Sequence, residues 1–408
     1  MRHADCFSDD QVPLDLLRER AFNLRWAQQP DDVIPLTAAD PDFRCAEPIR
    51  EALARHARDG VLSYTPAEGL PSFRAAVARW MGERKNVPCD PGHVFATDSA
   101  AAAMAVVARA CLGPGDEALI MDPVDFLFQT TIEMAGATAV RVAVAAGMGA
   151  DELVARLERA RTPRTRMLWL CNPHNPLGLV FDRATLAAMA QWAIRHGLRI
   201  VSDEIWSDIV YAPDTHCSIA SLGPEVAANS VTVYGFSKNF ALAGLRIGCI
   251  VCHDAALMER LVEASAARTT VFGASVLSQV AVVAAVEECG PWLDAFVAHL
   301  QAQRDIVAGH VARWPGVALV PPQGTFVAFP NVSALGIDGE ALCDLLLREA
   351  RVALVPGAPR WFGPGARGHV RLCFATSRAL LRVALQRIEP VIRRLAADAP
   401  AARPSIRA

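Results

Sequence analysis

Several features are missing from this 408-residue sequence, and each absence excludes a class of protein. No uninterrupted apolar run reaches the roughly eighteen residues that suggest a membrane-spanning helix. Residues 1–20 are charged and lack the apolar core of a secretory signal, which predicts a cytoplasmic protein. The net charge of -3 provides no basic excess for nucleic acid or an anionic membrane. Neither is therefore an expected partner.

A spaced cysteine framework is also missing. The eleven cysteines are scattered through apolar segments, as expected of small buried side chains in a reducing compartment. Cys249, Cys252 and His253 match the spacing of a covalent haem attachment. They lie in a strand-like run, however, where residues three apart point to opposite faces of a sheet. We interpret both cysteines as core residues, and we predict no metal site.

The composition is that of a well-packed globular enzyme, with 52% hydrophobic and 20% charged residues. A chain of this length is too long for one ordinary core, so two unequal domains are expected. We place a large domain at residues 46–290 and a small α+β domain at residues 291–398. Residues 1–45 form an N-terminal arm that belongs to the small domain, and residues 399–408 are expected to be a frayed tail.

Between residues 90 and 255, short apolar runs alternate with amphipathic helical segments. Strands that are apolar on both faces and alternate with helices indicate a mostly parallel sheet covered on both sides. The sequence therefore predicts a three-layer αβα domain with a seven-stranded sheet. The predicted strands are 93–97, 117–122, 139–144, 166–171, 198–203, 231–236 and 247–252.

The C-terminal part predicts a different arrangement. A long helical stretch at about 274–313 is followed by strand-like segments and two helices that begin near Glu340 and Ser377. This mixture is typical of a smaller α+β domain. The strand-like segments are 316–321, 325–330, 352–357 and 369–375, and another lies at 208–212.

Polar residues follow three strands of the predicted sheet. Asn175, Asp203 and Lys238 come at or just after the carboxyl ends of these strands, where ligands bind in open α/β sheets. A buried lysine can form an imine with the aldehyde of pyridoxal phosphate, and an acid can keep the ring nitrogen of that cofactor protonated. These residues predict a pyridoxal-phosphate site.

The phosphate of this cofactor needs cationic and N–H donors. Arg246 can form a forked bond to it, and the residues from Ser99 to Ala101 follow a strand and open a helix. Ser99 is equally well explained as an ordinary helix N-cap.

Six motifs in order resemble the class I/II aminotransferases, which are fold-type I pyridoxal-phosphate enzymes. They are PLTAADPDF, SYTPAEGLPSFRAAVARW, CNPHNPLG, SDEIW, SKNFALAGLRIG and HVRLCFA, and the resemblance spans roughly residues 35–395. It implies an aminotransferase that acts on amino-acid and keto-acid substrates, and a homodimer with active sites at the interface. Details around CNPHNPLG and residues 216–227 are similar to carbon–sulfur β-lyases related to cystathionine β-lyase. The alternative function is therefore β-elimination, which yields pyruvate and ammonia.

The resemblance implies a role for each residue that matches a family motif. Lys238 and Asp203 would be catalytic. The cofactor would be held by Lys238, Asp203, Asn175, Arg246, Ser99, Ala100, Ala101, Ser237, Trp206 and Tyr64, the last from the neighbouring subunit. The substrate would contact Arg371, Ala39, Asn175 and Asp125, with Arg371 binding the α-carboxylate.

Five residues depart from the family pattern. Two concern the phosphate: Ser99 replaces a glycine of the phosphate loop, and Gly235 replaces a serine that often binds the phosphate. Trp206 replaces a tyrosine that hydrogen-bonds the phenolic oxygen, Ala39 replaces a glycine, and Asp125 replaces an aromatic residue that stacks on the cofactor ring. Asp98 and Asp125 would be extra carboxylates near the cofactor. If they lacked donors, they would favour a cationic substrate over an acidic one. The alternative is that Asp98 caps a helix and Asp125 turns the chain.

Overall fold

Seven strands form the central sheet of the structure, a computed structural model that describes residues 3–399. The sheet order is β2-β8-β7-β6-β5-β3-β4. Strand β8 runs in the opposite direction to the other six strands, which all point the same way. Every strand lies within one residue of its predicted limits, so the predicted mostly parallel sheet is confirmed. The strands are β2 (Val94–Thr97), β3 (Glu117–Asp122), β4 (Thr138–Ala143), β5 (Thr165–Cys171), β6 (Arg199–Asp203), β7 (Ser230–Gly235) and β8 (Gly248–Cys252).

Alternate residues of the strand β8 face different cores. In β8, Cys249 and Val251 belong to one buried cluster, whereas Ile250 and Cys252 belong to the other. The two cysteines therefore point to opposite faces, as the strand periodicity predicts. This arrangement confirms the interpretation of both as core residues.

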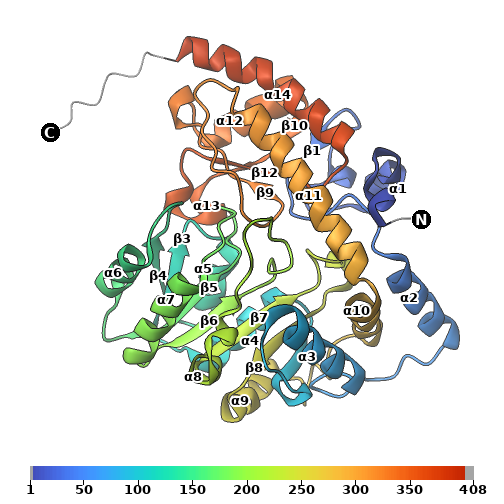
Figure 1. The fold of residues 1–408 in the computed structure, drawn as a ribbon, viewed down its shortest axis with the longest axis vertical. Helices are drawn as coiled ribbons and strands as arrows, with labels where there is room; N and C mark the ends of the chain where they lie inside the picture. The colour runs from blue at the N-terminus through green and yellow to red at the C-terminus, as the bar shows by residue number, and fades with distance from the viewer. Residues whose placement is uncertain (1–2, 400–408) are drawn as a thin grey trace.

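Helices cover both faces of the sheet and complete the three-layer αβα domain (Figure 1). Helix α4 packs on β7 and β8, α3 packs on β2, and α7 packs on β6. The helices of this part are α2 (Glu47–Asp59), α3 (Pro71–Lys85), α4 (Ala100–Cys111), α5 (Phe126–Met134), α6 (Ala150–Ala160), α7 (Arg183–Arg195), α8 (Pro224–Asn229), α9 (Ala255–Ser265) and α10 (Val276–Glu288).

The smaller α+β domain lies at the top of Figure 1, with the red helix α14 on its outer side. It contains an antiparallel sheet in the order β11-β12-β9 and a parallel pair, β1 with β10. The pairing of β1 brings the N-terminal segment into this domain. The elements are β1 (Ile34–Pro35), β9 (Val327–Ala328), β10 (Val352–Ala353), β11 (Val355–Pro356), β12 (Val370–Cys373), α1 (Leu14–Arg20), α11 (Gly290–Val311), α12 (Gly339–Leu345), α13 (Pro359–Phe362) and α14 (Arg378–Asp398).

Two strand-like segments do not form strands. The segments at 208–212 and 316–321 each make a single antiparallel bridge, Val210 with Gly324 and Ala318 with Asn331. Both segments run directly into proline, which has no N–H to continue a ladder. Of the predicted frayed tail, residues 400–408 lie outside the described residues.

The sheet brings three chain segments to one edge. Cys171, Asp203 and Val233 are register partners in β5, β6 and β7, so the segments after these parallel strands leave from the same side. Gly248 lets β8 approach α4, because a Cβ at this position would lie 2.6 Å from the backbone nitrogen of Ala100. None of the helices in the described part combines the length and apolar character needed to cross a bilayer.

Candidate active site

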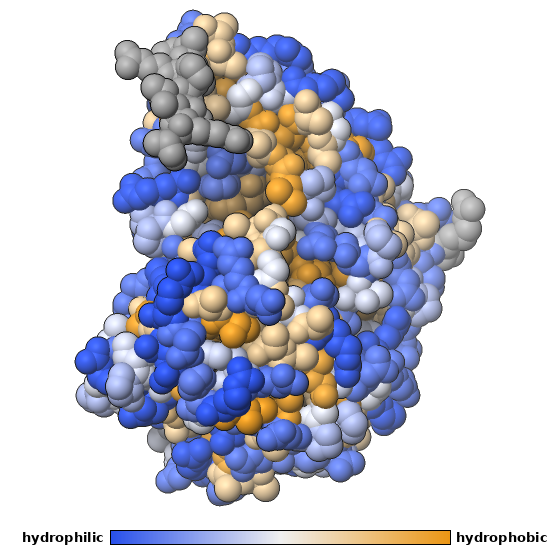
Figure 2. All heavy atoms as spheres, turned by 60° about the vertical axis from the view of Figure 1, so that its left-hand side comes forward, coloured by the Kyte–Doolittle hydropathy of each residue, from blue (hydrophilic) through white to orange (hydrophobic). Residues whose placement is uncertain are grey.

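A cavity of about 430 Å³ opens beyond this sheet edge. Its size is that of a typical small-molecule site. Figure 2 shows a recess between the upper and lower parts of the molecule, with hydrophobic side chains around it. The predicted site residues that line the cavity are Ala39, Ala100, Ala101, Asp125, Asn175, Asp203, Trp206, Lys238, Arg246 and Arg371.

Lys238 follows β7 and points across the cavity toward the N-terminal segment. Its Nζ donates a hydrogen bond to the carbonyl oxygen of Ala39 at 2.5 Å and lies 5.4 Å from the centre of the Trp206 ring. Burial lowers the pKa of the Lys238 ammonium, and the charge of Arg371 lowers it further, although nearby carboxylates oppose both effects. A lowered pKa makes the neutral, nucleophilic amine more available.

Asp203 ends β6 and is buried. Its Oδ1 accepts a hydrogen bond from the backbone nitrogen of Ile205 at 3.1 Å. Burial raises the pKa of Asp203 to about 7, and the negative charges of Asp125 and Glu204 contribute. A cationic N–H group placed against this carboxylate would stabilise its ionised form.

Arg371, Asn175 and Asp125 form a chain of hydrogen bonds along the cavity wall. Nη1 of Arg371 donates to Oδ1 of Asn175 at 3.3 Å, and Nδ2 of Asn175 donates to Oδ2 of Asp125 at 3.1 Å. Nη2 of Arg371 donates to the carbonyl oxygen of Thr37 at 3.3 Å. The buried Nε of Arg371 has no hydrogen-bond partner among residues 3–399, so a bound carboxylate would supply the acceptor that it lacks.

The N-terminus of α4 and Arg246 form the cationic side of the cavity. The first N–H groups of a helix have no acceptor within it and favour an anion. Ala100 and Ala101, the first two residues of α4, line the cavity together with Arg246. This side of the cavity suits a phosphate group.

Comparison with known proteins agrees with this geometry. The model of the family described as aminotransferase class I and II matches residues 31–388. The chain belongs to this family. It is 30% identical to the aspartate aminotransferase of Geobacillus stearothermophilus, over 91% of this chain and 94% of the relative. It is 29% identical to the cystathionine beta-lyase PatB of Bacillus subtilis (strain 168), over 88% of this chain and 93% of the relative.

Solved structures show the same relationship. The crystal structure titled "PLP-bound putative aminotransferase" from Clostridium difficile 630 superimposes on this chain with a TM-score of 0.84 at 25% identity. The match covers 92% of this chain and 97% of that chain. The chain is a pyridoxal-phosphate-dependent aminotransferase. The cavity fits this cofactor because it combines a lysine of lowered pKa, a buried carboxylate and an anion-binding helix N-terminus.

Three predicted cofactor residues of the aminotransferase do not line the cavity. Ser99 is the N-cap of α4, and its Oγ accepts a hydrogen bond from the backbone nitrogen of Ala102 at 3.0 Å, so the N-cap interpretation describes its side chain. Ser237 precedes Lys238 but is absent from the lining. Tyr64 is 86% exposed and contacts Phe272 instead.

Asp98 and Asp125 were expected to be carboxylates near the cofactor that lack hydrogen-bond donors, and the structure differs from this expectation at each residue. Asp98 lines a different cavity, so it does not face this site, and Ser99 rather than Asp98 caps α4. Asp125 does line the site, but it does not lack donors. Its Oδ1 accepts from the backbone nitrogen of Leu127 at 3.2 Å, which caps α5, and its Oδ2 accepts from Asn175. The premise of the predicted cationic substrate, an unsatisfied carboxylate, is therefore wrong.

Sequence reasoning missed an apolar part of the aminotransferase cavity. Leu24, Val355, Trp361 and Phe362 line it. These residues belong to no motif and come from the N-terminal segment and the small domain. Only their convergence in the folded chain marks them as site residues.

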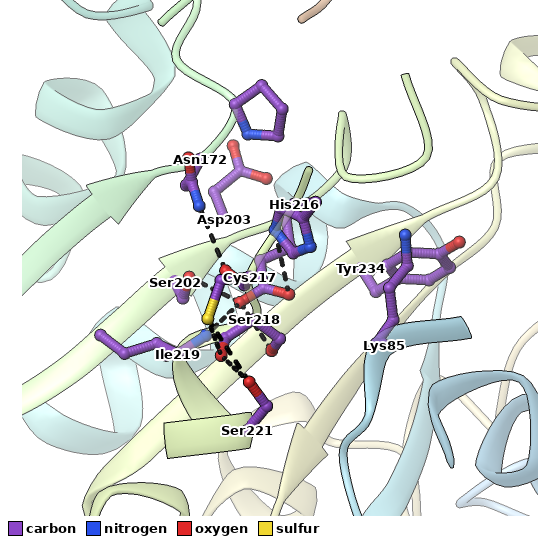
Figure 3. A network of polar contacts seen from close by, with 12 residues as sticks. Lys85, Asn172, Ser202, Asp203, His216, Cys217, Ser218, Ile219, Ser221 and Tyr234 are labelled. Atoms are coloured by element: carbon purple, nitrogen blue, oxygen red, sulfur yellow. Dashed lines mark hydrogen bonds and ion pairs between the residues drawn. The ribbon is translucent and has the colours of Figure 1, made fainter. Parts of the chain in front are cut away.

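A buried polar network lies behind Asp203 in the aminotransferase (Figure 3). Oε1 of Glu204, the next residue, accepts hydrogen bonds from Ser202 Oγ at 2.9 Å, Ser218 Oγ at 3.0 Å and the backbone nitrogen of Ile219 at 3.2 Å. Oε2 of Glu204 lies 3.8 Å from Nε2 of His216. None of these four partners lines the active-site cavity.

Proposed function

We propose that this aminotransferase uses Lys238 as its catalytic lysine and Asp203 as the partner of the cofactor ring nitrogen. The observation that carries the proposal is the convergence of Lys238, Asp203 and Asn175 from the ends of three strands on one cavity. Asn175 would contact the phenolic oxygen, with Trp206 beside it. Arg246, Ala100 and Ala101 would hold the phosphate, with backbone help from Ser99 and Ser237. Arg371 and Ala39 would contact the amino-acid substrate.

The chemistry divides between cofactor and protein. Bound pyridoxal phosphate supplies an electron sink for the bond that breaks at the amino-acid Cα. Asp203 holds the ring nitrogen in its protonated form, and Arg371 orients the substrate through its α-carboxylate. The neutral Lys238 amine accepts the Cα proton, a role that its lowered pKa favours.

The lysine assignment has a direct chemical test. Lys85 and Lys238 are the only lysines in the sequence, and Lys85 is buried in an ion pair with Asp208 at 2.6 Å. Borohydride reduction of the loaded enzyme followed by peptide mapping should attach the cofactor to Lys238 and leave Lys85 free. Lys238→Ala should abolish both the attachment and turnover. Attachment at Lys85, or near-normal turnover in Lys238→Ala, would contradict the assignment.

A second candidate function is β-elimination from a sulfur-containing amino acid. The similarity to PatB favours it, and the same lysine, acid and arginine would serve. The products separate the two reactions. Transamination gives a keto acid and the aminated cofactor in equal amounts, whereas elimination from cystathionine gives pyruvate, ammonia and a thiol.

We also propose a homodimer in which Tyr64 reaches the cavity of the partner subunit. Tyr64 and Phe272, whose rings lie 5.4 Å apart, are exposed together with Val61, Leu62 and Val271, an apolar cluster typical of a protein interface. Sedimentation should give twice the chain mass. Tyr64→Phe should weaken cofactor binding without dissociating the dimer. A monomer that binds the cofactor normally would exclude this arrangement.

Two broader assignments are proposals as well. The domain limits at residues 46–290 and 291–398, with the arm at 1–45, are supported by the separate sheets. A cytoplasmic location is supported by the eleven free cysteines, six of them buried, which suit a reducing compartment. Limited proteolysis tests the domain limits. Fractionation of the source cells tests the cytoplasmic location.

A further inference from the structure

A carboxylate lies beside the arginine that would bind the substrate α-carboxylate. Asp125 reaches Arg371 through a single intervening side chain, Asn175, with hydrogen bonds of 3.1 and 3.3 Å. Its negative charge raises the pKa of Arg371, although burial lowers that pKa more. The negative charge of Asp125 therefore offsets the positive charge of Arg371 in the wall of the cavity.

The cavity has no spare cation for a second substrate carboxylate. Over the described range, its basic lining residues are Lys238, Arg246 and Arg371, and the proposed function uses all three. Once the α-carboxylate binds Arg371, that carboxylate and the Asp125–Arg371 pair together carry one net negative charge. A second carboxylate would enter a partly desolvated site in which residues 3–399 of the same subunit offer no further counterion.

The rest of the wall offers apolar surface instead. The rings of Phe126 and Trp361 meet edge to face at 5.8 Å, and Phe362 and Val355 lie beside them. Phe126 is 37% exposed and Leu24 is 43% exposed. Covering such surfaces with an apolar side chain is favourable, since apolar area is removed from water.

We infer that Asp125 is a specificity-determining residue, and that the preferred amino donor has an apolar side chain, aromatic or long aliphatic, rather than an acidic one. This inference rests on the proposed function of Arg371 and Lys238. Asp125 disfavours dicarboxylic substrates by placing a negative charge next to the α-carboxylate site, while Phe126 and Trp361 contact the apolar side chain.

Substrate kinetics provide the first test. For the loaded enzyme, kcat/KM for phenylalanine and methionine should exceed kcat/KM for glutamate and aspartate by more than about tenfold. Asp125→Asn should reduce this ratio about tenfold or more, chiefly by improving the acidic substrates. Its Oδ1 can still accept from Leu127, so the helix cap is retained. Equal use of glutamate and phenylalanine by the wild type, or an unchanged ratio in Asp125→Asn, would overturn the inference.

A matched control separates charge from helix capping. Asp338 caps α12 by accepting a hydrogen bond from the backbone nitrogen of Ala341 at 2.8 Å, and it is exposed and remote from the cavity lining. Asp338→Asn should leave the substrate ratio unchanged. A change equal to that in Asp125→Asn would show that loss of an aspartate cap, rather than the charge in the cavity, alters the ratio.

Equilibrium binding distinguishes this inference from the proposed function. Calorimetry should show that 3-phenylpropionate binds the loaded enzyme more tightly than glutarate, and that Asp125→Asn narrows the difference. If no amino acid is converted but this binding pattern holds, the proposed reaction is wrong and the role of Asp125 stands. If amino acids are converted but glutarate binds as tightly as 3-phenylpropionate, the inference is wrong. The wild-type comparison decides the matter even if Asp125→Asn fails to fold.

Discussion

Asp203 and Glu204 are neighbours in sequence, yet they occupy opposite environments. Burial raises the pKa of each to about 7. Asp203 faces the cavity and accepts one backbone hydrogen bond from Ile205, whereas three donors converge on a single oxygen of Glu204. The alternation of side chains at the end of β6 thus separates a carboxylate that faces the active-site cavity from one that accepts hydrogen bonds in a buried network.

One side of the Glu204 network lacks hydrogen bonds within the described part of the chain. Oε2 of Glu204, and both ring nitrogens of His216, have no hydrogen-bond partner among residues 3–399. Burial lowers the pKa of His216 to about 3, so this histidine is neutral near pH 7. His216 borders a second cavity of about 420 Å³ that is separate from the active site. The contrast shows that burial and a raised pKa are shared by the two carboxyl groups, whereas access to the active-site cavity distinguishes them.

The largest expected effect separates the two carboxyl groups by activity. Asp203→Asn should lower kcat/KM by on the order of 100-fold or more, because a neutral amide cannot stabilise a protonated ring nitrogen. Glu204→Gln should retain activity within about tenfold, since its amide oxygen can still accept from Ser202 and Ser218. Steady-state kinetics of both variants test this contrast, and equal losses would break it.

The next effect concerns the free energy of unfolding, for which Glu204 should matter more than Asp203. Glu204→Ala should lower the free energy of unfolding by about 2–4 kcal/mol, because it leaves Ser202 Oγ, Ser218 Oγ and the Ile219 N–H without their acceptor. Glu204→Gln is the matched control and should lose much less. Urea unfolding of the cofactor-free proteins measures both changes. A loss from Asp203→Asn as large as that from Glu204→Ala would argue against the proposed division of roles.

The raised pKa values of Asp203 and Glu204 predict that the free energy of unfolding depends on pH. Both carboxyl groups have folded-state pKa values raised to about 7, above the ordinary values of 3.8 and 4.5. The folded protein therefore binds more protons than the unfolded chain between about pH 4 and pH 7. Their stabilising contribution is full below this window and is lost as the pH rises through about 7. Glu204→Gln should flatten the fall in unfolding free energy over this range, and an unchanged slope would contradict the raised pKa.

The smallest effect concerns one donor of the network. Ser218→Ala should lower the free energy of unfolding by about 1 kcal/mol, the usual contribution of one buried hydrogen bond. Activity should not change, since Ser218 lies outside the active-site lining. Loss of activity without loss of stability would instead couple the network to the reaction.

Much of the site could be predicted from short-range information. The seven strands follow from apolar runs that alternate with helices, and Lys238, Asp203 and Asn175 follow from their positions at the ends of these strands. Parallel strands must end at a common edge, so local sequence and chain order determined where these three side chains would gather. Arg371 was predicted as a substrate-binding residue from its family motif alone.

Only the tertiary structure decided the surroundings of these residues. Asp125 and Arg371 are 246 positions apart, and nothing in either local sequence reveals that Asn175 links them. The same holds for Leu24 and Trp361, which share a cavity wall although they belong to distant segments. The sequence by itself determined the strands, the cofactor class and the catalytic candidates, because these depend on periodicity and position within an element. The partners of Asp125 and the apolar wall depend on the packing of the small domain against the sheet edge, which no local pattern encodes.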